Sequence, residues 1–255
     1  MPLATWAAAL ILATLADPAP APTPAPVASA APVKDERALA LLRKMSDRLQ
    51  GAKSFTFKAR TSREVLVNNG VQATFFNDLR VALQRPDKVA ANRTGDLPEF
   101  RFAYDGKAMT AYAPGTREWA TTAAPPTIDA MIFAAYEQAK LSFPADEVLV
   151  ADPFAAMTKD LTSIELVGRT TIAGRKTDHV VLANPNMEVQ VWLDVKTGLP
   201  VQSAVVYLDD PRKPHFYIEY LDWRLDPKLP ASTFALPKPS GAAQVDFSGI
   251  ANAAQ

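Results

Sequence analysis

Residues 187–208 read MEVQVWLDVKTGLPVQSAVVYL, and this stretch decides the fold that the sequence predicts. Apolar side chains fill every second position from 187 to 193, and the alternation returns from 201 to 207, which is typical of strands with one buried face. A three-residue loop at 196–198, with Gly198 in the left-handed conformation, joins the two strands as a hairpin. One apolar face then continues across both strands, as in the interior of a large antiparallel sheet. The expected pairs are Leu193 with Val201, Val191 with Ser203, Val189 with Val205, and Met187 with Tyr207.

The composition limits what the chain can be. Its 255 residues are 48% hydrophobic and 21% charged, which is enough apolar material for one sizeable core. Lys plus Arg and Asp plus Glu each total 27, so there is no basic excess to neutralise phosphates, and we expect no nucleic-acid partner. The chain contains no cysteine, which excludes disulfides, thiolate nucleophiles, Cys-ligated metals and a lipidated N-terminal Cys.

An apolar run, WAAALILATLA, occupies residues 6–16. It is too short to cross a bilayer, which needs ~20 apolar residues, and small residues at 14, 16, 28 and 30 offer Ala-x-Ala-like cleavage sites. We therefore predict a signal peptide over residues 1–16, with cleavage as late as residue 30, a periplasmic location and no transmembrane segment in the mature chain. No Lys or Arg precedes the run, and a buried helix is the alternative.

The composition divides the rest of the chain into three parts. Residues 17–33, DPAPAPTPAPVASAAPV, are rich in Pro and Ala, and they predict an extended linker. A folded domain is expected over residues 34–247. The Ala- and Gly-rich residues 248–255 are expected to form a flexible tail.

Two amphipathic stretches predict the main helices. Residues 35–51 carry an apolar stripe at helical spacing, with Asp35 placed to cap the start and Gly51 to end it. This stripe is expected to pack on the sheet, and a membrane-surface helix is the alternative. Residues 127–140, TIDAMIFAAYEQAK, follow a Pro-Pro break, and they predict either a helix buried on two sides or a lid over an apolar cavity. A shorter helix is expected at 153–159.

The first hairpin spans residues 55–83, and its register follows from the position of the apolar side chains. A three-residue loop at 68–70 aligns the apolar residues of the two strands, whereas a two-residue turn would mix charge with the core. Arg63 and Asn77 then lie on the apolar face near the hairpin end, where they could line a rim. The register sets Phe55 opposite Leu83, Phe57 opposite Val81, Ala59 opposite Leu79, and Val67 opposite Val71.

A second hairpin is expected around a two-residue turn at Asp105-Gly106. This turn would set Phe102 opposite Met109 and Phe100 opposite Ala111. Further strands are expected at residues 88–94, 117–121, 164–169, 178–182 and 215–223, with a final edge strand at 245–247. The order of elements predicts an α+β fold, in which a strongly curved antiparallel sheet forms an unclosed β-barrel with helices on its concave side.

No catalytic motif stands out. The sequence contains no nucleophile elbow, phosphate loop, dinucleotide fingerprint or metal-ligand spacing, so we expect no enzyme activity, no metal and no cofactor. Asp178-His179 is the one suggestive pair. Because adjacent residues of a strand point to opposite faces, these two side chains are not expected to form an acid–base couple.

Several short motifs carry a resemblance to known proteins, and in order they span residues 36–247. Most of them resemble turn sequences of the periplasmic lipoprotein carrier LolA and its relatives. Three others resemble a family of predicted periplasmic proteins of unknown function, within the same LolA-like fold group. The LolA-like motifs are Tyr104-Asp105-Gly106, Tyr112-Ala113-Pro114, Asp194 with Thr197-Gly198-Leu199-Pro200, and Phe234-Ala235-Leu236-Pro237. The others are Asp178-His179, Gln190-Val191-Trp192, and Gly241-Ala242 with Phe247.

The resemblance implies a half-barrel over residues 34–247 with an apolar cavity that accepts acyl chains. We therefore predict a periplasmic binding or carrier protein for an apolar small molecule, a lipid or a lipoprotein acyl chain. An envelope-stress sensor or protein-interaction module, binding an envelope protein with the outer face or edge of its sheet, is the first alternative, and a hydrolase is the second. Residues 131–133 are the candidate cover of the opening. The predicted cavity residues are Phe55, Phe57, Val81, Leu83, Phe100, Phe102, Met109, Met131, Ile132, Phe133, Val189, Val191 and Val205.

Overall fold

Twelve strands form one sheet in the computed structural model, which describes residues 34–68, 70–143 and 145–250. The signal peptide and linker expected over residues 1–33, the hairpin residue 69 and the end of the expected tail, 251–255, lie outside the described residues. The described residues belong to one compact unit. None of their helices combines the length and the hydropathy that a bilayer crossing demands.

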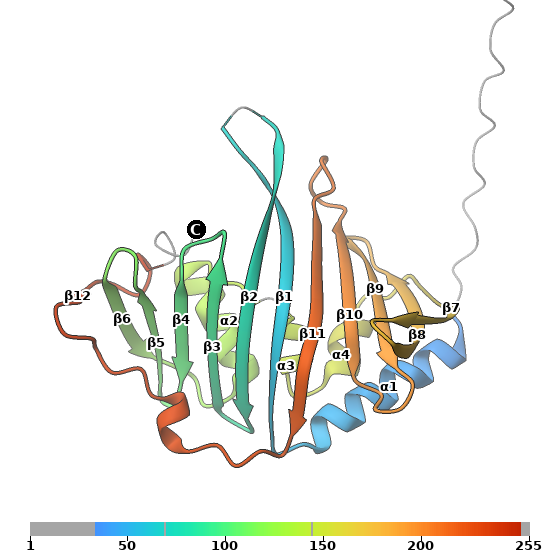
Figure 1. The fold of residues 1–255 in the computed structure, drawn as a ribbon, viewed down its shortest axis with the longest axis horizontal. Coiled ribbons are helices and arrows are strands. Elements are labelled where there is room, and N and C mark those ends of the chain that lie inside the picture. The colour runs from blue at the N-terminus through green and yellow to red at the C-terminus, as the bar shows by residue number, and fades with distance from the viewer. Residues whose placement is uncertain (1–33, 69, 144, 251–255) are drawn as a thin grey trace, which may run out of the picture. The chain divides into compact units, whose positions relative to one another are not determined.

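The sheet is antiparallel except at one edge (Figure 1). Its order is β12-β6-β5-β4-β3-β2-β1-β11-β10-β9-β8-β7, and its two edge strands do not pair with each other. The strands are β1 (Ser54–Leu66), β2 (Gln72–Gln84), β3 (Lys88–Gly95), β4 (Phe100–Tyr104), β5 (Ala108–Ala113), β6 (Glu118–Ala123), β7 (Ser163–Ile172), β8 (Arg175–Ala183), β9 (Met187–Asp194), β10 (Pro200–Tyr207), β11 (His215–Leu225) and β12 (Ala243–Gln244).

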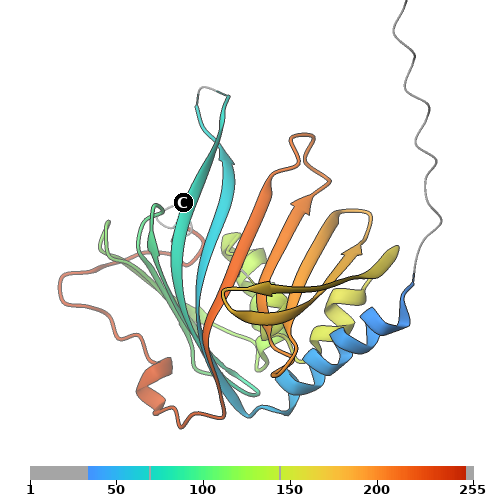
Figure 2. The ribbon, with the colours of Figure 1, turned by 45° about the vertical axis from the view of Figure 1, so that its right-hand side comes forward.

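The helices lie on the concave side of this sheet, and the strands curl around them (Figure 2). They are α1 (Glu36–Gly51), α2 (Ile128–Ala139), α3 (Asp146–Leu149) and α4 (Pro153–Thr158). A 3-10 helix, η1 (Ala231–Phe234), follows the last long strand and lies on the convex side. The curved, unclosed antiparallel sheet with helices on its concave side confirms the predicted fold class. The four-residue α3 was not predicted.

The helices begin where the sequence places capping side chains. The Asp35 carboxylate accepts a hydrogen bond from the backbone N–H of Arg37 at 2.9 Å, and Thr127 caps α2 through the N–H of Ala130 at 3.2 Å. Between α1 and α4, the Ser46 hydroxyl accepts from the N–H of Phe154 at 3.0 Å and donates to Asp152 at 3.3 Å. These bonds fix the helices to one another beneath the sheet.

The predicted register of the β1–β2 hairpin is confirmed. Phe55 pairs with Leu83 and Phe57 with Val81, and all four side chains belong to the hydrophobic core. At the end of the hairpin, the N–H of Val67 donates to the carbonyl of Val71 at 3.0 Å. The central hairpin is confirmed in its outer part, where Val191 pairs with Ser203, Val189 with Val205 and Met187 with Tyr207.

Three predicted pairings, in two hairpins, are wrong. Leu193 pairs with Pro200 instead of Val201, because a bulge between Pro200 and Gln202 adds a residue to β10. In the β4–β5 hairpin, Phe102 pairs with Ala111 instead of Met109, and Tyr104 pairs with Met109. The predicted pair of Phe100 with Ala111 is therefore also wrong. The loop is two residues longer than predicted, and the same side chains still face inward.

The chain after β11 returns across the convex face to the far edge of the sheet. The indole Nε1 of Trp119 donates to the carbonyl of Leu236 at 3.0 Å, and the N–H of Val245 donates to the carbonyl of Trp119 at 3.0 Å. The final strand is Ala243–Gln244, two residues before the predicted position, and it runs parallel to β6. Ile250 is fully buried, so packing extends three residues beyond the predicted domain end at 247.

Candidate functional site

One row of inward-facing side chains crosses most of the sheet. On β1 it contains Arg63, which shares the pleat of the buried Phe55 and Phe57. Each member pairs with the next one on the adjacent strand, in the sheet order β2-β1-β11-β10-β9-β8-β7. We call this set the inner row. In strand order it consists of Phe75, Arg63, Phe216, Val205, Val189, Leu182 and Ile164.

Burial changes abruptly at the inner row. The neighbouring row toward the core is closed to solvent, whereas the inner row is partly open from β2 to β9. At ~4.8 Å between strands, this open part is ~19 Å long. It forms an apolar strip on the concave side of the sheet. In the closed row Thr61, Ile218, Ser203 and Val191 are 6%, 1%, 3% and 2% exposed. In the open part Phe75, Arg63, Phe216, Val205 and Val189 are all half-buried.

Helix α2 carries the largest exposed apolar side chains of the concave side. Phe133 is 68% exposed and Tyr136 is 50% exposed, and they lie three residues apart on one side of the helix. Met131 on the same helix is fully buried and anchors α2 to the core. Large exposed apolar patches often contact a ligand, a membrane or a partner, and Phe133 and Tyr136 are candidates for such a contact.

Helix α3 places two carboxylates near the strip. The hydroxyl of the fully buried Tyr220 donates to the Glu147 carboxylate at 3.2 Å. Burial, and then the charge of Asp146, raise the pKa of Glu147 to about 7. Burial, followed by the Glu147 and Asp146 charges, also raises the pKa of Tyr207, and the positive charge of Arg63 opposes this rise. The carboxylates and Arg63 therefore act on the same tyrosine at the open end of the sheet.

The thirteen residues predicted to line a cavity separate into two groups. Eight are core side chains, no more than 7% exposed and packed with α1, α2 and α3 in one hydrophobic cluster. The other five keep solvent contact, with Phe133 the most exposed. The core group is Phe55, Phe57, Val81, Leu83, Phe102, Met109, Met131 and Val191. The half-buried residues are Phe100, Ile132, Val189 and Val205.

Sequence reasoning did not identify Phe75, Phe216 or Glu147 as site residues. Phe75 lies opposite Arg63 in the predicted hairpin register, so that register already placed it on the inner face. The alternation of Phe216, Ile218 and Tyr220 gave a signal for the inward face of β11. No signal in the sequence indicated that β11 pairs with β1, and Glu147 lies in the unpredicted α3.

Asp178 and His179 point to opposite faces and bind different partners. Asp178 forms an ion pair with Arg169 at 2.8 Å. His179 stacks on Trp192 with ring centroids 4.2 Å apart, and its Nε2 lies 3.0 Å from the side-chain amide oxygen Oε1 of Gln190. Burial lowers the pKa of His179, and the Gln190 contact opposes this effect. The two side chains therefore form no acid–base couple. The described residues also contain no cluster of three or more potential metal ligands.

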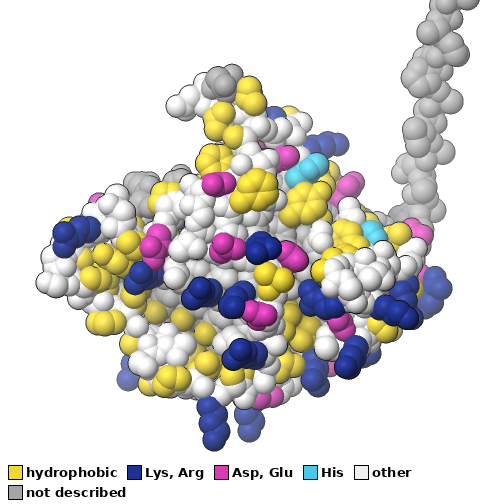
Figure 3. Space-filling view, in the orientation of Figure 1, with side chains coloured by type: hydrophobic (Ala, Val, Ile, Leu, Met, Phe, Trp, Pro, Cys, Tyr) yellow, Lys and Arg dark blue, Asp and Glu magenta, His cyan; other side chains and the backbone are white. Residues whose placement is uncertain are grey.

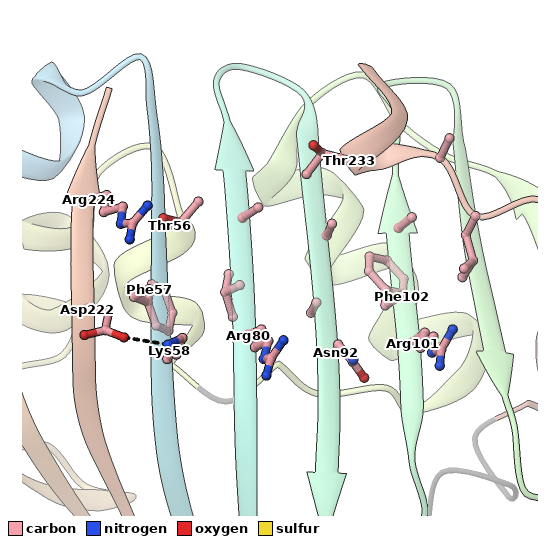
Figure 4. Close-up of a pocket in the computed structure, with 17 residues that line it drawn as sticks. Thr56, Phe57, Lys58, Arg80, Asn92, Arg101, Phe102, Asp222, Arg224 and Thr233 are labelled. Atoms are coloured by element: carbon pink, nitrogen blue, oxygen red, sulfur yellow. Dashed lines mark hydrogen bonds and ion pairs between the residues drawn. The ribbon is translucent and has the colours of Figure 1, made fainter. Parts of the chain in front are cut away.

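A second surface, on the convex face, is a groove of about 490 Å³ over β11, β1, β2, β3 and β4. Small side chains form its floor, including Ala82, Ala90 and Ala103, and η1 with the following chain forms one wall. Figure 4 shows four basic side chains along it, namely Lys58, Arg80, Arg101 and Arg224. We call this surface the convex groove.

The charges of the convex groove are only partly balanced. Lys58 pairs with Asp222 at 2.7 Å, and Arg101 pairs with Glu99 at 2.8 Å. Within the described part of the chain, Arg80 and Arg224 have no ion-pair partner. Figure 3 shows acidic side chains interspersed among the basic ones across this face.

One family model matches most of the chain. A family model described as "Predicted periplasmic protein (DUF2092)" matches residues 38–248. No curated protein matches the chain.

The chain also has a low similarity to solved structures, including LprF, LppX and MucB. LprF from Mycobacterium bovis is 13% identical, with a TM-score of 0.45, over 83% of this chain and 100% of its own. The lipoprotein LppX from Mycobacterium tuberculosis is 15% identical, with a TM-score of 0.43, over 74% and 96%. MucB, solved in complex with MucA(peri), is 15% identical, with a TM-score of 0.41, over 78% of this chain and 60% of MucB. The chain thus spans less than two thirds of the MucB structure.

Proposed function

The chain belongs to the DUF2092 family of predicted periplasmic proteins, and from this premise we propose that it is a non-catalytic binding or carrier protein for an apolar ligand. The ligand class is a lipid or a lipoprotein acyl chain. The ligand lies on the concave side of the sheet, along the open part of the inner row. The predicted periplasmic location agrees with the family description.

The change of burial at the inner row is the observation that supports this proposal most. Phe75, Phe216, Val205 and Val189 are apolar and point inward, yet they remain half-buried although the next row is closed. Apolar area left open in a concave surface favours an apolar ligand, because each buried methylene contributes ~0.8 kcal/mol. The residues of the closed row and the core beneath then form the support of the site.

Helix α2 is the element that we assign as the cover of the ligand. Met131 fixes it to the core, while Ile132 is half-buried and Phe133 is 68% exposed. Bound acyl chains would bury part of this exposed aromatic surface. We propose that residues 131–133 cover the ligand and that Phe133 is the side chain that contacts it.

An environment-sensitive apolar dye tests this proposal, with two neighbouring residues of β11 as a matched pair. Phe216 points into the strip, whereas Tyr217 is 43% exposed on the convex face. We expect the wild-type protein to bind the dye and a fatty acid to displace it. Phe216→Glu should weaken binding by about tenfold or more, because a carboxylate would be desolvated in the strip. Tyr217→Glu should bind as the wild type does.

Circular dichroism must first show that both variants are folded. Failure of the folded wild type to take up dye would contradict the proposal. So would a larger loss of binding in Tyr217→Glu than in Phe216→Glu.

The convex groove supports a second candidate function, in which an acidic, extended segment of an envelope protein docks on the sheet. The supporting observation is that Arg80 and Arg224, above a floor of small residues, have no ion-pair partner among the residues that the structure describes. Charges of this kind mainly increase the association rate and the specificity for a segment of opposite charge. A labelled oligoglutamate peptide should bind the wild type at low salt, and Arg80→Glu should abolish binding without changing dye uptake. Equal peptide binding by both proteins would exclude this role.

A further inference from the structure

We propose that Arg63 recognises the anionic head group, a carboxylate or a phosphate, of an amphipathic ligand whose apolar chain lies along the inner row. This inference rests on the proposed function and specifies its substrate class. It starts from one observation: Arg63 is the single charged side chain among the seven residues of the inner row.

The immediate neighbours of Arg63 are aromatic. On one side it pairs with Phe75 of β2, and on the other it pairs with Phe216 of β11. The same strand carries Arg60 on the convex face, where it lies 3.8 Å from Asp78 and is solvent-exposed. Arg60 thus has the ordinary environment of a surface arginine, and Arg63 does not.

The Arg63 guanidinium has no hydrogen-bond or ion-pair partner in the described part of the chain. Its Nε is buried without a hydrogen-bond acceptor, and none of the ion pairs found there includes this residue. Burying part of a cation without an acceptor destabilises a fold. An anionic oxygen at this position would supply the missing acceptor, and a guanidinium can bind such a group through two parallel hydrogen bonds.

The surrounding charges leave Arg63 available for an anion. Arg93 on β3 carries the same charge as Arg63: burial, and then the charge of Arg63, lower the pKa of Arg93 to about 10. The Asp146 and Glu147 carboxylates share the environment of Tyr207 with Arg63, but neither lies within ion-pair distance of it. Because the pKa of Glu147 is about 7, this carboxyl is only partly ionised near neutral pH.

The rest of the inner row fits the chain of such a ligand. From Arg63 the row continues over Phe216, Val205 and Val189 without another polar side chain, and it ends at the buried Leu182 and Ile164. An amphiphile would place its head group at β1 and its chain toward β9. The head group would lie beside the opening, where the inner row is in contact with solvent.

Matched ligands test this assignment on the full, delipidated protein. Oleate and oleyl alcohol share one chain and differ in the charge of the head group. A charged hydrogen bond contributes roughly 10- to 100-fold in affinity, so we expect the wild type to prefer oleate by about that factor. Arg63→Met should lose this preference and retain its affinity for oleyl alcohol. Arg60→Met, on the opposite face of the same strand, should keep the preference.

A second pair of ligands separates the two possible anions. Dodecanoate and dodecyl phosphate are each compared with dodecanol, and tighter binding of either anion than of dodecanol supports the assignment. Folding provides an independent measurement: Arg63→Met should raise the urea midpoint, because it removes a partly buried cation without a partner.

The outcomes distinguish this inference from the proposed function. Equal affinity of the wild type for oleate and oleyl alcohol would overturn the role of Arg63 and leave apolar binding intact. The same conclusion would follow if Arg63→Met kept the preference for oleate. If the wild type bound neither ligand, the proposed function would fail, and the inference with it.

Discussion

Replacing Glu147 with Gln should change how the stability of the protein depends on pH. The Glu147 carboxyl is half-buried on α3, and its pKa is about 7 instead of the ordinary 4.5. The native state therefore holds a proton that the unfolded state releases between these two values. The stabilisation linked to this group is complete below pH 4.5 and is lost as the pH rises through 7.

The size of the effect follows from the pKa difference. At about 1.4 kcal/mol per pH unit, the full difference corresponds to about 3 kcal/mol, and partial solvent access reduces it to about 1–3 kcal/mol. Glu147→Gln keeps an oxygen acceptor for the Tyr220 hydroxyl, which lies 3.2 Å from the carboxylate, and removes the titration. The free energy of unfolding of this variant should fall less between pH 5 and pH 8 than that of the wild type.

Urea unfolding at several pH values between 5 and 8 measures this difference. Glu137→Gln, at an exposed position of α2, is the matched control and should follow the wild-type curve. Parallel curves for Glu147→Gln and the wild type would refute the reasoning. That result would mean that Glu147 is ionised without penalty in the folded protein.

Two further predictions concern the scaffold. Phe102→Ala should lower the free energy of unfolding by about 3–5 kcal/mol, because Phe102 is 3% exposed and packs edge-on against Phe143 at 4.8 Å. Phe76→Ala should change the free energy of unfolding by less than about 0.5 kcal/mol, since Phe76 is 62% exposed. Urea unfolding measures both variants, and a larger loss of stability in Phe76→Ala than in Phe102→Ala would contradict these predictions. Asp35→Ala should cost about 1 kcal/mol, through the lost cap of α1 and the contact at 3.4 Å with the N–H of Leu166. An unchanged urea midpoint for Asp35→Ala would show that neither contact contributes.

The registers that the sequence predicted correctly are those in which a wrong alignment carries a large penalty. In the β1–β2 hairpin, a slip by one residue would turn Phe55 and Phe57 outward and bring charged side chains inward. The apolar pattern alone therefore selects one register. The same reasoning identified the inward face of the central hairpin, from Met187 to Val191.

The register of the β4–β5 hairpin was predicted wrongly because the predicted and the observed registers place the same side chains on the inner face. A shift by two residues keeps Phe102 and Met109 inward, so the apolar pattern does not distinguish the alternatives. The Asp105 carboxylate decides the loop length, since it accepts hydrogen bonds from the N–H groups of Lys107 and Ala108, both at 2.9 Å. Because such a side-chain contact lengthens the loop without changing the apolar pattern, the pattern alone does not reveal it.

The open strip could not be located from the sequence, because it depends on contacts between distant segments. Arg63 and Phe216 are neighbours only because β11 pairs with β1, more than 150 residues earlier in the chain. The sequence indicated which side chains point inward. It did not indicate how far along the strands the helices cover them, which decides that Val191 is closed and Val189 is open.

A spin-labelled fatty acid, observed by NMR, tests the central claim most directly. A doxyl group near the end of the acyl chain broadens nearby methyl signals of the protein. We predict broadening of the inward-facing Val189 and Val205 methyls, and much weaker broadening at Val206, the next residue of β10, which points to the convex face. Broadening that is strongest at Val206, or that is absent from all three valines when the fatty acid is bound, would contradict a ligand site on the concave side.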